Sequence, residues 1–201
     1  TTLVGTTNLD AVDIDGAVQI DAAVSVGVDD TGFDVKFFGA TSGKFVLFDA
    51  SEDTLSVSGD FTTVTAGTSN FVAGVNTGNS IASGGNYNVL VGDEAGTALT
   101  TGDGNVAVGF DALKTEDANG FNTAVGFEAL KTLNAGADAG NTAVGYQAGV
   151  DLTTGVQNVI IGYVAGPDLT DADFNVAVGV GALFNDHKGN KSTAIGHNTL
   201  V

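Results

Sequence analysis

Two histidines are the first side chains of this sequence to consider for catalysis. His197 follows a glycine at a position that holds Asp, Phe, Tyr or Val in similar phrases, and His187 lies in the polar stretch 185–188. A Ser, His and Asp triad needs a serine held beside a histidine, and the nucleophile motif G-x-S-x-G is absent. We interpret His197 as a variable repeat position and His187 as a solvated turn residue. We therefore expect no catalytic residue and no enzyme activity.

Acidic residues gather near turns, where carboxylates can converge on Ca²⁺. The two groups are Asp10, Asp13, Asp15 and Asp21, and Asp168, Asp171 and Asp173. Neither matches the EF-hand loop or the glycine-rich nonapeptide of calcium-binding β-rolls. A solvated acidic surface is the favoured interpretation. The alternative is one ion shared by three copies of an Asp at a threefold axis, which fails if a chelator leaves melting and assembly unchanged. No carboxylate pair stands out for glycoside hydrolysis, and we expect no resident metal or cofactor.

The composition excludes several classes of partner. The chain has 201 residues, 24 Asp and Glu against six Lys, no Arg, 30 Gly and a net charge of −18. Nucleic acids and anionic membranes are recognised through Lys and Arg, so neither is expected. The lack of Cys removes disulfides and thiolate metal sites. The hydrophobic content of 43% is typical of globular proteins and higher than that of a disordered acidic chain. No apolar run predicts membrane insertion and no signal peptide is evident, and the start without Met predicts a piece of a longer protein.

A nine-residue sequence repeat occurs seven times from residue 88 onward. Its copies start 17 residues apart, except for one spacing of 19 whose two extra residues fall in the connector 131–140. Insertions of this kind are typical of exposed loops between repeats. The copies are NVLVGDEAG (88–96), NVAVGFDAL (105–113), NTAVGFEAL (122–130), NTAVGYQAG (141–149), NVIIGYVAG (158–166), NVAVGVGAL (175–183) and STAIGHNTL (192–200).

Each unit is predicted to contain two short extended pieces separated by turns. Val106, Val108 and Phe110 share one face of such a strand, and Ala107 and Gly109 share the other, as a period of two requires. The connectors are rich in Gly, Asn and Asp, which favour turns. A coil of 17 residues fits a parallel β-solenoid whose coils stack about 4.8 Å apart.

Two repeated residues are predicted to stabilise this stack. The asparagine that opens six units is expected to form a corner ladder, in which side-chain amides satisfy turn backbone and one another. The repeated glycine indicates a sharp bend, a positive φ or a close backbone approach. The residues concerned are Asn88, Asn105, Asn122, Asn141, Asn158 and Asn175, and Gly92, Gly109, Gly126, Gly145, Gly162, Gly179 and Gly196.

The small residues between the strand valines predict self-association. Ala occupies positions 107, 124, 143, 177 and 194, and only Leu90 and Ile160 replace it. A face this small is expected to meet another backbone at short range. Because a thin coil buries little by itself, we predict that identical chains pack side by side around a threefold axis as an obligate homotrimer.

The first 87 residues predict further β-structure, so the chain is assigned to the all-β class. The alternating apolar residues of 6–27 and 54–67 resemble the β-prism repeats of phage fibre shafts. Between them, the apolar runs 33–38, 44–48 and 54–57 predict an antiparallel meander. Residues 66–87 are rich in Gly, Ser, Asn and Thr and are interpreted as a transition. The predicted parts are 1–65 (shaft-like β region with meander), 66–87 (transition) and 88–201 (solenoid of seven coils).

Two of the repeats resemble a known family. NTAVG at 122–126 and STAIG at 192–196 resemble the head repeats of trimeric autotransporter adhesins, whose unit reads Asn-Ser-Val-Ala-Ile-Gly. This resemblance implies a trimeric left-handed parallel β-roll. The longer period departs from that family, and no coiled-coil stalk or membrane anchor follows in the sequence. The NTAVGxxAL phrasing is also similar to tail-fibre and other virion fibre proteins of marine tailed phages. The resemblance covers residues 88–200.

The leading functional prediction is a structural and adhesive fibre segment of a phage virion, in a tail fibre or capsid fibre, that contributes to host-receptor binding. The alternatives are the head of a bacterial trimeric surface adhesin and a segment of a polysaccharide-degrading tailspike. Expected partners are two further copies, other virion proteins and a host-surface glycan or protein, and the expected location is the virion or the extracellular space. The candidate binding residues, whose rings either stack on sugars or pack between coils or protomers, are Phe110, Phe127, Tyr146, Tyr163 and His197.

Overall fold

The computed structural model describes residues 35–38, 45–49, 54–58, 65–136, 138–186 and 189–200. All regular elements in these ranges are strands. The chain divides into two compact units, residues 1–61 and 62–201, which are described separately. The predicted all-β class is confirmed for the described ranges.

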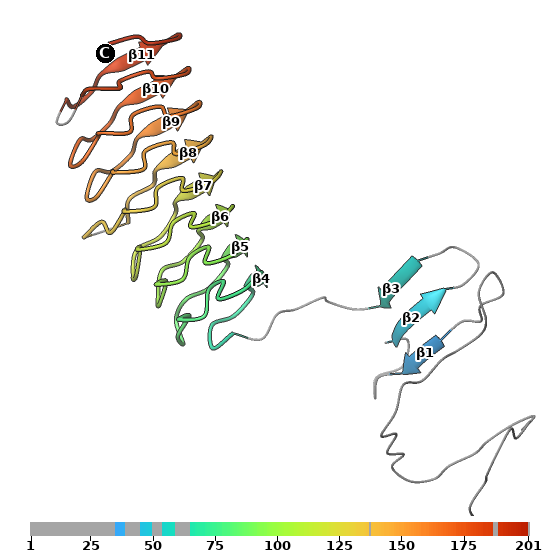
Figure 1. The fold of residues 1–201 in the computed structure, drawn as a ribbon. Helices are drawn as coiled ribbons and strands as arrows, with labels where there is room; N and C mark the ends of the chain where they lie inside the picture. The colour runs from blue at the N-terminus through green and yellow to red at the C-terminus, as the bar shows by residue number, and fades with distance from the viewer. Residues whose placement is uncertain are drawn as a thin grey trace, which may run out of the picture. The chain divides into compact units, whose positions relative to one another are not determined.

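The first unit contains an antiparallel meander. Its strands β1 (Val35–Phe38), β2 (Phe45–Asp49) and β3 (Thr54–Ser58) pair in the order β1-β2-β3 (Figure 1). Val35 lies opposite Phe48, and Phe48 lies opposite Leu55. These strands coincide with the three predicted apolar runs. The shaft-like phrase at 6–27, and with it the predicted β-prism, lies outside the described residues.

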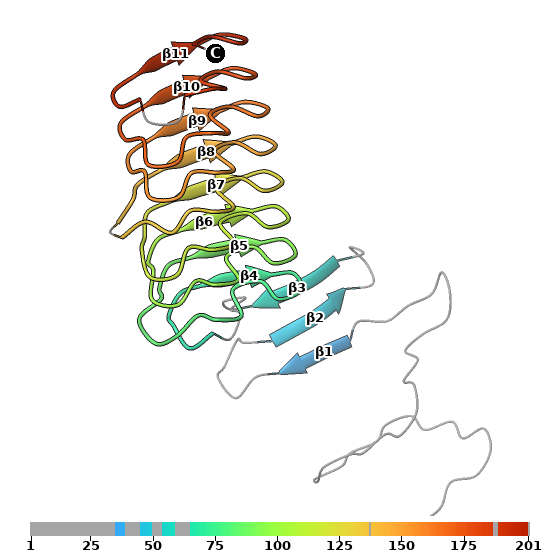
Figure 2. The same cartoon turned by 60° about the vertical axis from the view of Figure 1, so that its left-hand side comes forward.

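The second unit is a parallel β-solenoid. Its strands form one eight-stranded sheet in sequence order, with every strand in register with the next, so that Ala107 lies beside Ala124 and Ala124 beside Ala143 (Figure 2). Seven turns of chain join the strands, in agreement with the β-roll architecture that the repeats imply. The strands are β4 (Phe71–Ala73), β5 (Val89–Val91), β6 (Val106–Val108), β7 (Thr123–Val125), β8 (Thr142–Val144), β9 (Val159–Ile161), β10 (Val176–Val178) and β11 (Thr193–Ile195).

The parallel sheet begins one strand before the first repeat found in the sequence. β4 pairs in register with β5, and its phrase NFVAGVNTG places Asn70 and Gly74 where the other copies have their Asn and Gly. The amide N–H of Asn88 donates to Oδ1 of Asn70 at 2.8 Å, as in the later coils. Residues 70–78 are therefore an additional copy of the repeat within the segment interpreted as a transition.

Each described coil has one strand rather than the two extended pieces predicted. Left-handed backbone causes the difference, because four positions in a coil have positive φ and curl the chain. Around β6 these are Gly104 (65°), Gly109 (131°), Asp111 (55°) and Leu113 (52°). Residues in this conformation cannot continue a strand. The part of the coil beyond the repeated glycine therefore consists of turns.

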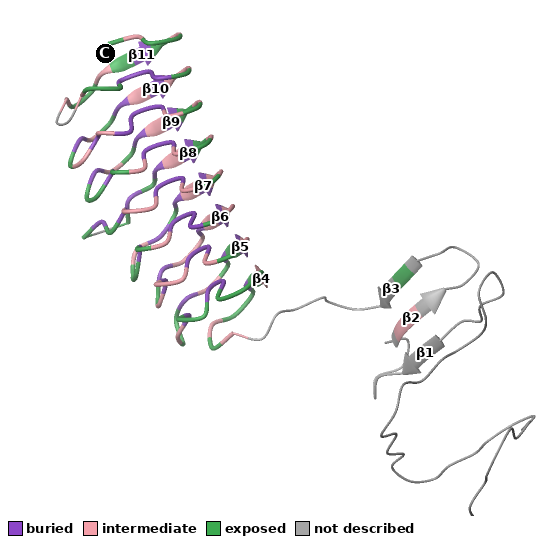
Figure 3. Cartoon of the chain, in the orientation of Figure 1, coloured by how far each residue is buried: buried purple, intermediate pink, exposed green. Residues whose placement is uncertain are grey.

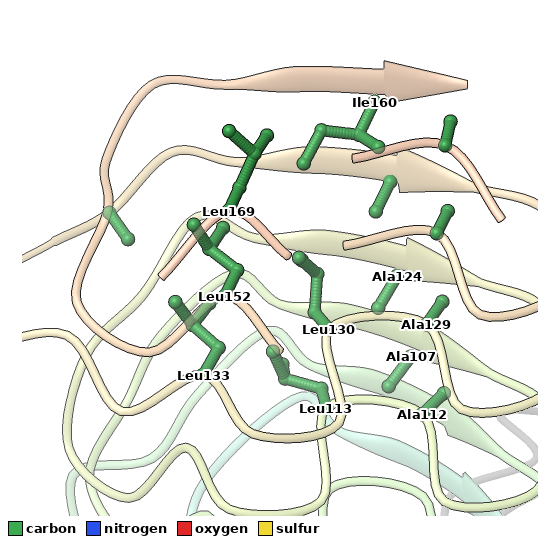
Figure 4. Close-up of a cluster of buried hydrophobic side chains, with 14 of the residues drawn as sticks. Ala107, Ala112, Leu113, Ala124, Ala129, Leu130, Leu133, Leu152, Ile160 and Leu169 are labelled. Atoms are coloured by element: carbon green, nitrogen blue, oxygen red, sulfur yellow. The ribbon is translucent and has the colours of Figure 1, made fainter. Parts of the chain in front are cut away.

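The alanine row lies inside the solenoid of a single chain. Ala107, Ala124, Ala143 and Ala177 are fully buried, and Ala194 nearly so. They face a second row of buried alanines from the turns, and Figure 4 shows members of both rows pointing into the core. The small residues do allow a close backbone approach, but the backbone is that of the same chain. The buried alanine row is therefore not available as a surface for another protomer.

A row of large apolar residues from the connectors completes the core. Leu99, Leu133, Leu152 and Leu169 are fully buried, and the colouring in Figure 3 follows this buried interior from coil to coil. Their spacing places one leucine three residues after the end of most repeat phrases. Because the connectors are rich in Gly, Asn and Asp, they are predicted as turns only, and this half of the core is not evident from the sequence.

Candidate functional site

The repeated asparagines form a continuous buried ladder. The amide N–H of Asn105 donates to Oδ1 of Asn88 at 2.8 Å, and the amide N–H of Asn122 donates to Oδ1 of Asn105 at 3.0 Å. The side-chain Nδ2 of Asn158 donates to the carbonyl of Ala172 at 2.8 Å. The asparagines therefore link neighbouring coils, and those from Asn70 to Asn158 also satisfy a turn carbonyl. The ladder runs from Asn70 to Ser192 through Asn88, Asn105, Asn122, Asn141, Asn158 and Asn175.

The repeated glycines permit both the bend and the stacking. Gly92 has a φ of 129°, and a Cβ at this residue would lie 2.6 Å from the carbonyl oxygen of Gly109 in the next coil. The same conformation recurs at Gly109, Gly126, Gly145, Gly162, Gly179 and Gly196. No larger residue can occupy such a position without moving the adjacent coil.

Several acidic connector residues act as hydrogen-bond acceptors between coils. Oδ1 of Asp103 accepts the amide N–H of Asn86 at 2.6 Å, and Oδ1 of Asp173 accepts the amide N–H of Val156 at 2.9 Å. Asp171 and Asp168 lie in the same connector as Asp173. In the part of the chain that the structure describes, no three His, Asp or Glu side chains converge as metal ligands.

Three parallel rows of side chains form an exposed face on the outside of the solenoid sheet, here called the outer sheet face. Two rows come from the first and third residues of each strand, and the third from the residue after the repeated glycine. Among its 24 positions, Asp93 and His197 are the only members of a charged residue type. Exposures include 38% at Val89, 37% at Val144 and 68% at Ile195. A largely apolar exposed face that extends over eight strands is typical of an interaction site.

Four of the five predicted binding residues stack on one another in the third row. Ring centroids lie 5.2 Å apart for Phe110 and Phe127, 5.3 Å for Phe127 and Tyr146, and 5.1 Å for Tyr146 and Tyr163. The planes are inclined by 10–20°. Each inner ring therefore has both faces partly covered by its neighbours. His197 is exposed two coils beyond Tyr163, with Val180 between them. Packing between coils accounts for the row better than a series of sugar platforms.

A network of ion pairs runs alongside this aromatic row. Nζ of Lys131 lies 3.0 Å from Asp111 and 2.6 Å from Glu128, and Nζ of Lys114 lies 3.0 Å from Asp111 and 2.5 Å from Glu94. Burial opposes ionisation of Asp111, but hydrogen bonds from both lysines outweigh it and lower its pKa. The hydrogen bond from Lys131 likewise lowers the pKa of Glu128. Both acids are ionised at neutral pH, so neither can act as the general acid of a glycosidase.

Glu116 is a carboxyl group inside the apolar connector row. It is fully buried at the position that Leu99 and Leu133 occupy in adjacent coils. Its Oε1 accepts from Nδ2 of Asn119 at 3.0 Å, and its Oε2 accepts the amide N–H of Ala135 at 3.3 Å. Burial raises the pKa of Glu116, although these donors favour the charged form. Because no solvent reaches the carboxyl group, its role is structural: it fixes the connector that contains the two-residue insertion.

The searches for similar proteins gave no match. No family model, no curated protein and no solved structure matches this chain. Among the residues that the structure describes, no helix is long and apolar enough to cross a membrane. His187 lies outside these residues. The proposed function therefore rests on the geometry of the solenoid.

Proposed function

We propose that this chain is a structural and adhesive segment of a homotrimeric extracellular fibre, of the kind that phage virions use to contact a host. The observation that carries the proposal is the outer sheet face. It is continuous over eight strands and mostly apolar, with Asp93 and His197 as its only residues of a charged type, although the chain as a whole has a net charge of −18. The fibre packs three copies through these faces, and the charged turns remain in solvent and keep assembled fibres apart.

The size of the outer sheet face supports this assembly. Eight strands about 4.8 Å apart and three rows about 7 Å apart give a footprint on the order of 700 Å². This footprint is close to the area of about 800 Å² per partner that a stable protein–protein interface buries. It is larger than the largest apolar patch on a typical monomer, which is about 300–600 Å². In this arrangement the stacked rings of Phe110, Phe127, Tyr146 and Tyr163 are interface residues, and association shields them from water.

The stacked ladders support a mechanical role. Each coil is joined to the next by strand pairing and by the buried asparagines, and no buried side-chain polar atom of the described coils lacks a hydrogen-bond partner. A stack that is satisfied in this way is rigid and transmits load along its axis. Such a segment suits a fibre that holds a binding surface at a distance from a particle.

Native mass spectrometry tests the assembly. One chain has a mass of 19.9 kDa, so a trimer has three times this mass, about 60 kDa. Val144→Lys places a charge at the centre of the outer sheet face and should reduce the trimer to monomers. Thr154→Lys adds the same charge at an exposed connector position and should leave the trimer intact. A wild-type protein that remains at the mass of one chain at micromolar concentration would refute the proposal.

A further inference from the structure

A second row of aromatic residues lies at the corner just before each strand. This corner row is formed by the residue that precedes the ladder asparagine in each coil, and it contains Ser69, Tyr87, Gly104, Phe121, Gly140, Gln157, Phe174 and Lys191. Tyr87 is 67% exposed, Phe121 60% and Phe174 45%. These three rings are more widely spaced than those of the outer sheet face, because other residue types separate them. We propose that the corner row binds an extended neutral polysaccharide along the solenoid axis.

The glycines in this row keep the rings accessible. Gly104 separates Tyr87 from Phe121, and a Cβ at Gly104 would lie 3.2 Å from Cδ1 of Phe121, so the Phe121 side chain leans over this glycine. Nζ of Lys191 lies 6.0 Å from the centroid of Phe174, which shows the same lean toward the preceding coil. Tyr87, Phe121 and Phe174 occupy the same position in stacked coils, so the spacing of the rings follows the spacing of the coils. Unlike Phe127 and Tyr146, neither Tyr87 nor Phe121 has an aromatic residue in an adjacent coil of its row.

The spacing of the rings suits an extended polysaccharide. Tyr87 and Phe121 are two coils apart, or about 10 Å, and Phe121 and Phe174 are three coils apart, or about 14 Å. One coil step is close to the length of one sugar in a flat, cellulose-like chain. The three rings therefore match sugars separated by two and then three residues along such a chain. Sugar rings present C–H groups that pack on aromatic faces, and this packing needs no charge.

Polar groups for sugar hydroxyls lie beside the rings at fixed positions. The carboxylate of Asp103 is held against the backbone of Asn86, the residue before Tyr87. Oδ1 of Asn190 accepts the amide N–H of Asp173, the residue before Phe174. These carboxylate and amide groups are hydrogen-bonding partners for hydroxyls. The acidic groups also repel uronic and sialic acids, which is why the proposed ligand is neutral.

The backbone provides an independent argument. Tyr87, Phe121 and Phe174 have φ values of 59°, 62° and 61°, and Gly104 and Gly140 adopt the same conformation at 65° and 60°. A left-handed backbone is unfavourable for residues with a side chain and free for glycine. Glycine therefore serves the fold at this position, and the exposed aromatic residues oppose it. Ser69, Gln157 and Lys191 are also exposed in this row, with φ values of 58°, 56° and 61°, so the fold does not require an aromatic ring at this corner.

This inference names the partner of the proposed adhesive fibre and so rests on that function. Affinity electrophoresis in gels that contain hydroxyethylcellulose tests it, with dextran as a flexible, compact polysaccharide control. We expect hydroxyethylcellulose to retard the wild-type protein and dextran not to. Tyr87→Gly combined with Phe121→Gly should raise the apparent Kd for hydroxyethylcellulose by about tenfold or more. Gln157→Gly, in the same row and conformation, should bind like the wild type.

The outcomes separate binding from assembly and from folding. The glycine substitutions relieve backbone strain, so the thermal unfolding temperature should be unchanged or higher, and loss of binding will not reflect unfolding. Their native mass should remain that of the wild type. The inference is overturned if hydroxyethylcellulose does not retard the wild type, if dextran retards it equally, or if the double variant binds as well. A monomeric wild type that still binds would refute the trimer and leave the polysaccharide site supported.

Discussion

Exchanging the sizes of two core residues within one coil should cost far less than changing either residue alone. The core position of the strand and the left-handed position at the end of the repeat phrase vary together in most coils. Where the strand has Leu90 or Ile160, the end position has Gly96 or Gly166, and in three coils a buried strand alanine goes with a buried leucine: Ala107 with Leu113, Ala124 with Leu130, and Ala177 with Leu183. The coil of Ala143 ends in Gly149 instead, where a Cβ would meet Leu130 and Ile160 of the adjacent coils. The two side chains fill one shared volume.

The structure gives the magnitude for the coil of Ile160. Ile160→Ala removes three carbons from a fully buried side chain, about 2.4 kcal/mol of transfer free energy, and the cavity raises the loss to about 4 kcal/mol. A Cβ at Gly166 would lie 2.7 Å from Cδ1 of Leu169 and 3.5 Å from Cγ2 of Ile160. Gly166→Leu alone should therefore cost about 2–3 kcal/mol through overpacking and left-handed strain. The double variant should lie within about 1.5 kcal/mol of the wild type, because it reproduces the coil of Ala124 and Leu130.

Urea unfolding followed by circular dichroism, at one fixed protein concentration, measures the coupling. The double variant should be at least about 3 kcal/mol more stable than the sum of the single changes predicts. The matched control combines Ile160→Ala with Gly96→Leu, which has the same position and a φ of 57° in a distant coil. Its two effects should add to within about 0.5 kcal/mol. If the Ile160 and Gly166 changes were equally additive, the shared core volume would be refuted.

Two further predictions concern the buried polar groups. Asn141→Ala removes the acceptor for the amide N–H of Asn158 and the donor to the carbonyl of Gly155. It should lower the free energy of unfolding in urea by about 2–4 kcal/mol, and a loss below about 1 kcal/mol would contradict the stabilising role of the ladder. Because burial raises the pKa of Glu116 above 4.5, the stability that it contributes is full below pH 4.5 and is lost as the pH rises through the folded-state pKa. The thermal unfolding temperature of the wild type should therefore fall relative to that of Glu116→Gln as the pH rises from 4.5. A difference between the two temperatures that does not change with pH would contradict this prediction.

The sequence alone predicted the sheet because each strand repeats the same short pattern. A β-branched residue, a small residue and a fixed glycine recur at constant spacing, and register follows when the pattern is stacked. The additional copy at 70–78 escaped detection because Phe71, Val72 and Ala73 replace the usual residue types of the strand. Its Asn and Gly were the signal that could have identified it.

The sequence could not decide which face of the strand lies inside. Both faces are apolar in this repeat, so alternation gives the period but not the direction. The decision depends on the buried leucines of the connectors, such as Leu133 and Leu152, which share one core with the row that contains Ala107. The conformation of the turns could not be predicted either, because Leu and Phe rarely adopt a left-handed backbone. Without these turns, neither the outer sheet face nor the corner row can be placed.

The left-handed positions connect stability with function across the whole solenoid. Each non-glycine residue there costs about 1–2 kcal/mol, and different contacts offset this cost. Leu113 offsets it by complete burial, which contributes about 1.5–3 kcal/mol, and Asp111 by its lysine partners. Tyr87 and Phe121 are exposed and have no comparable compensation from burial of their own side chains. Exposed Ser69, Gln157 and Lys191 have the same left-handed backbone, so the rest of the coil offsets this cost whichever side chain is present, and the rings of Tyr87 and Phe121 are free to serve a ligand outside the chain.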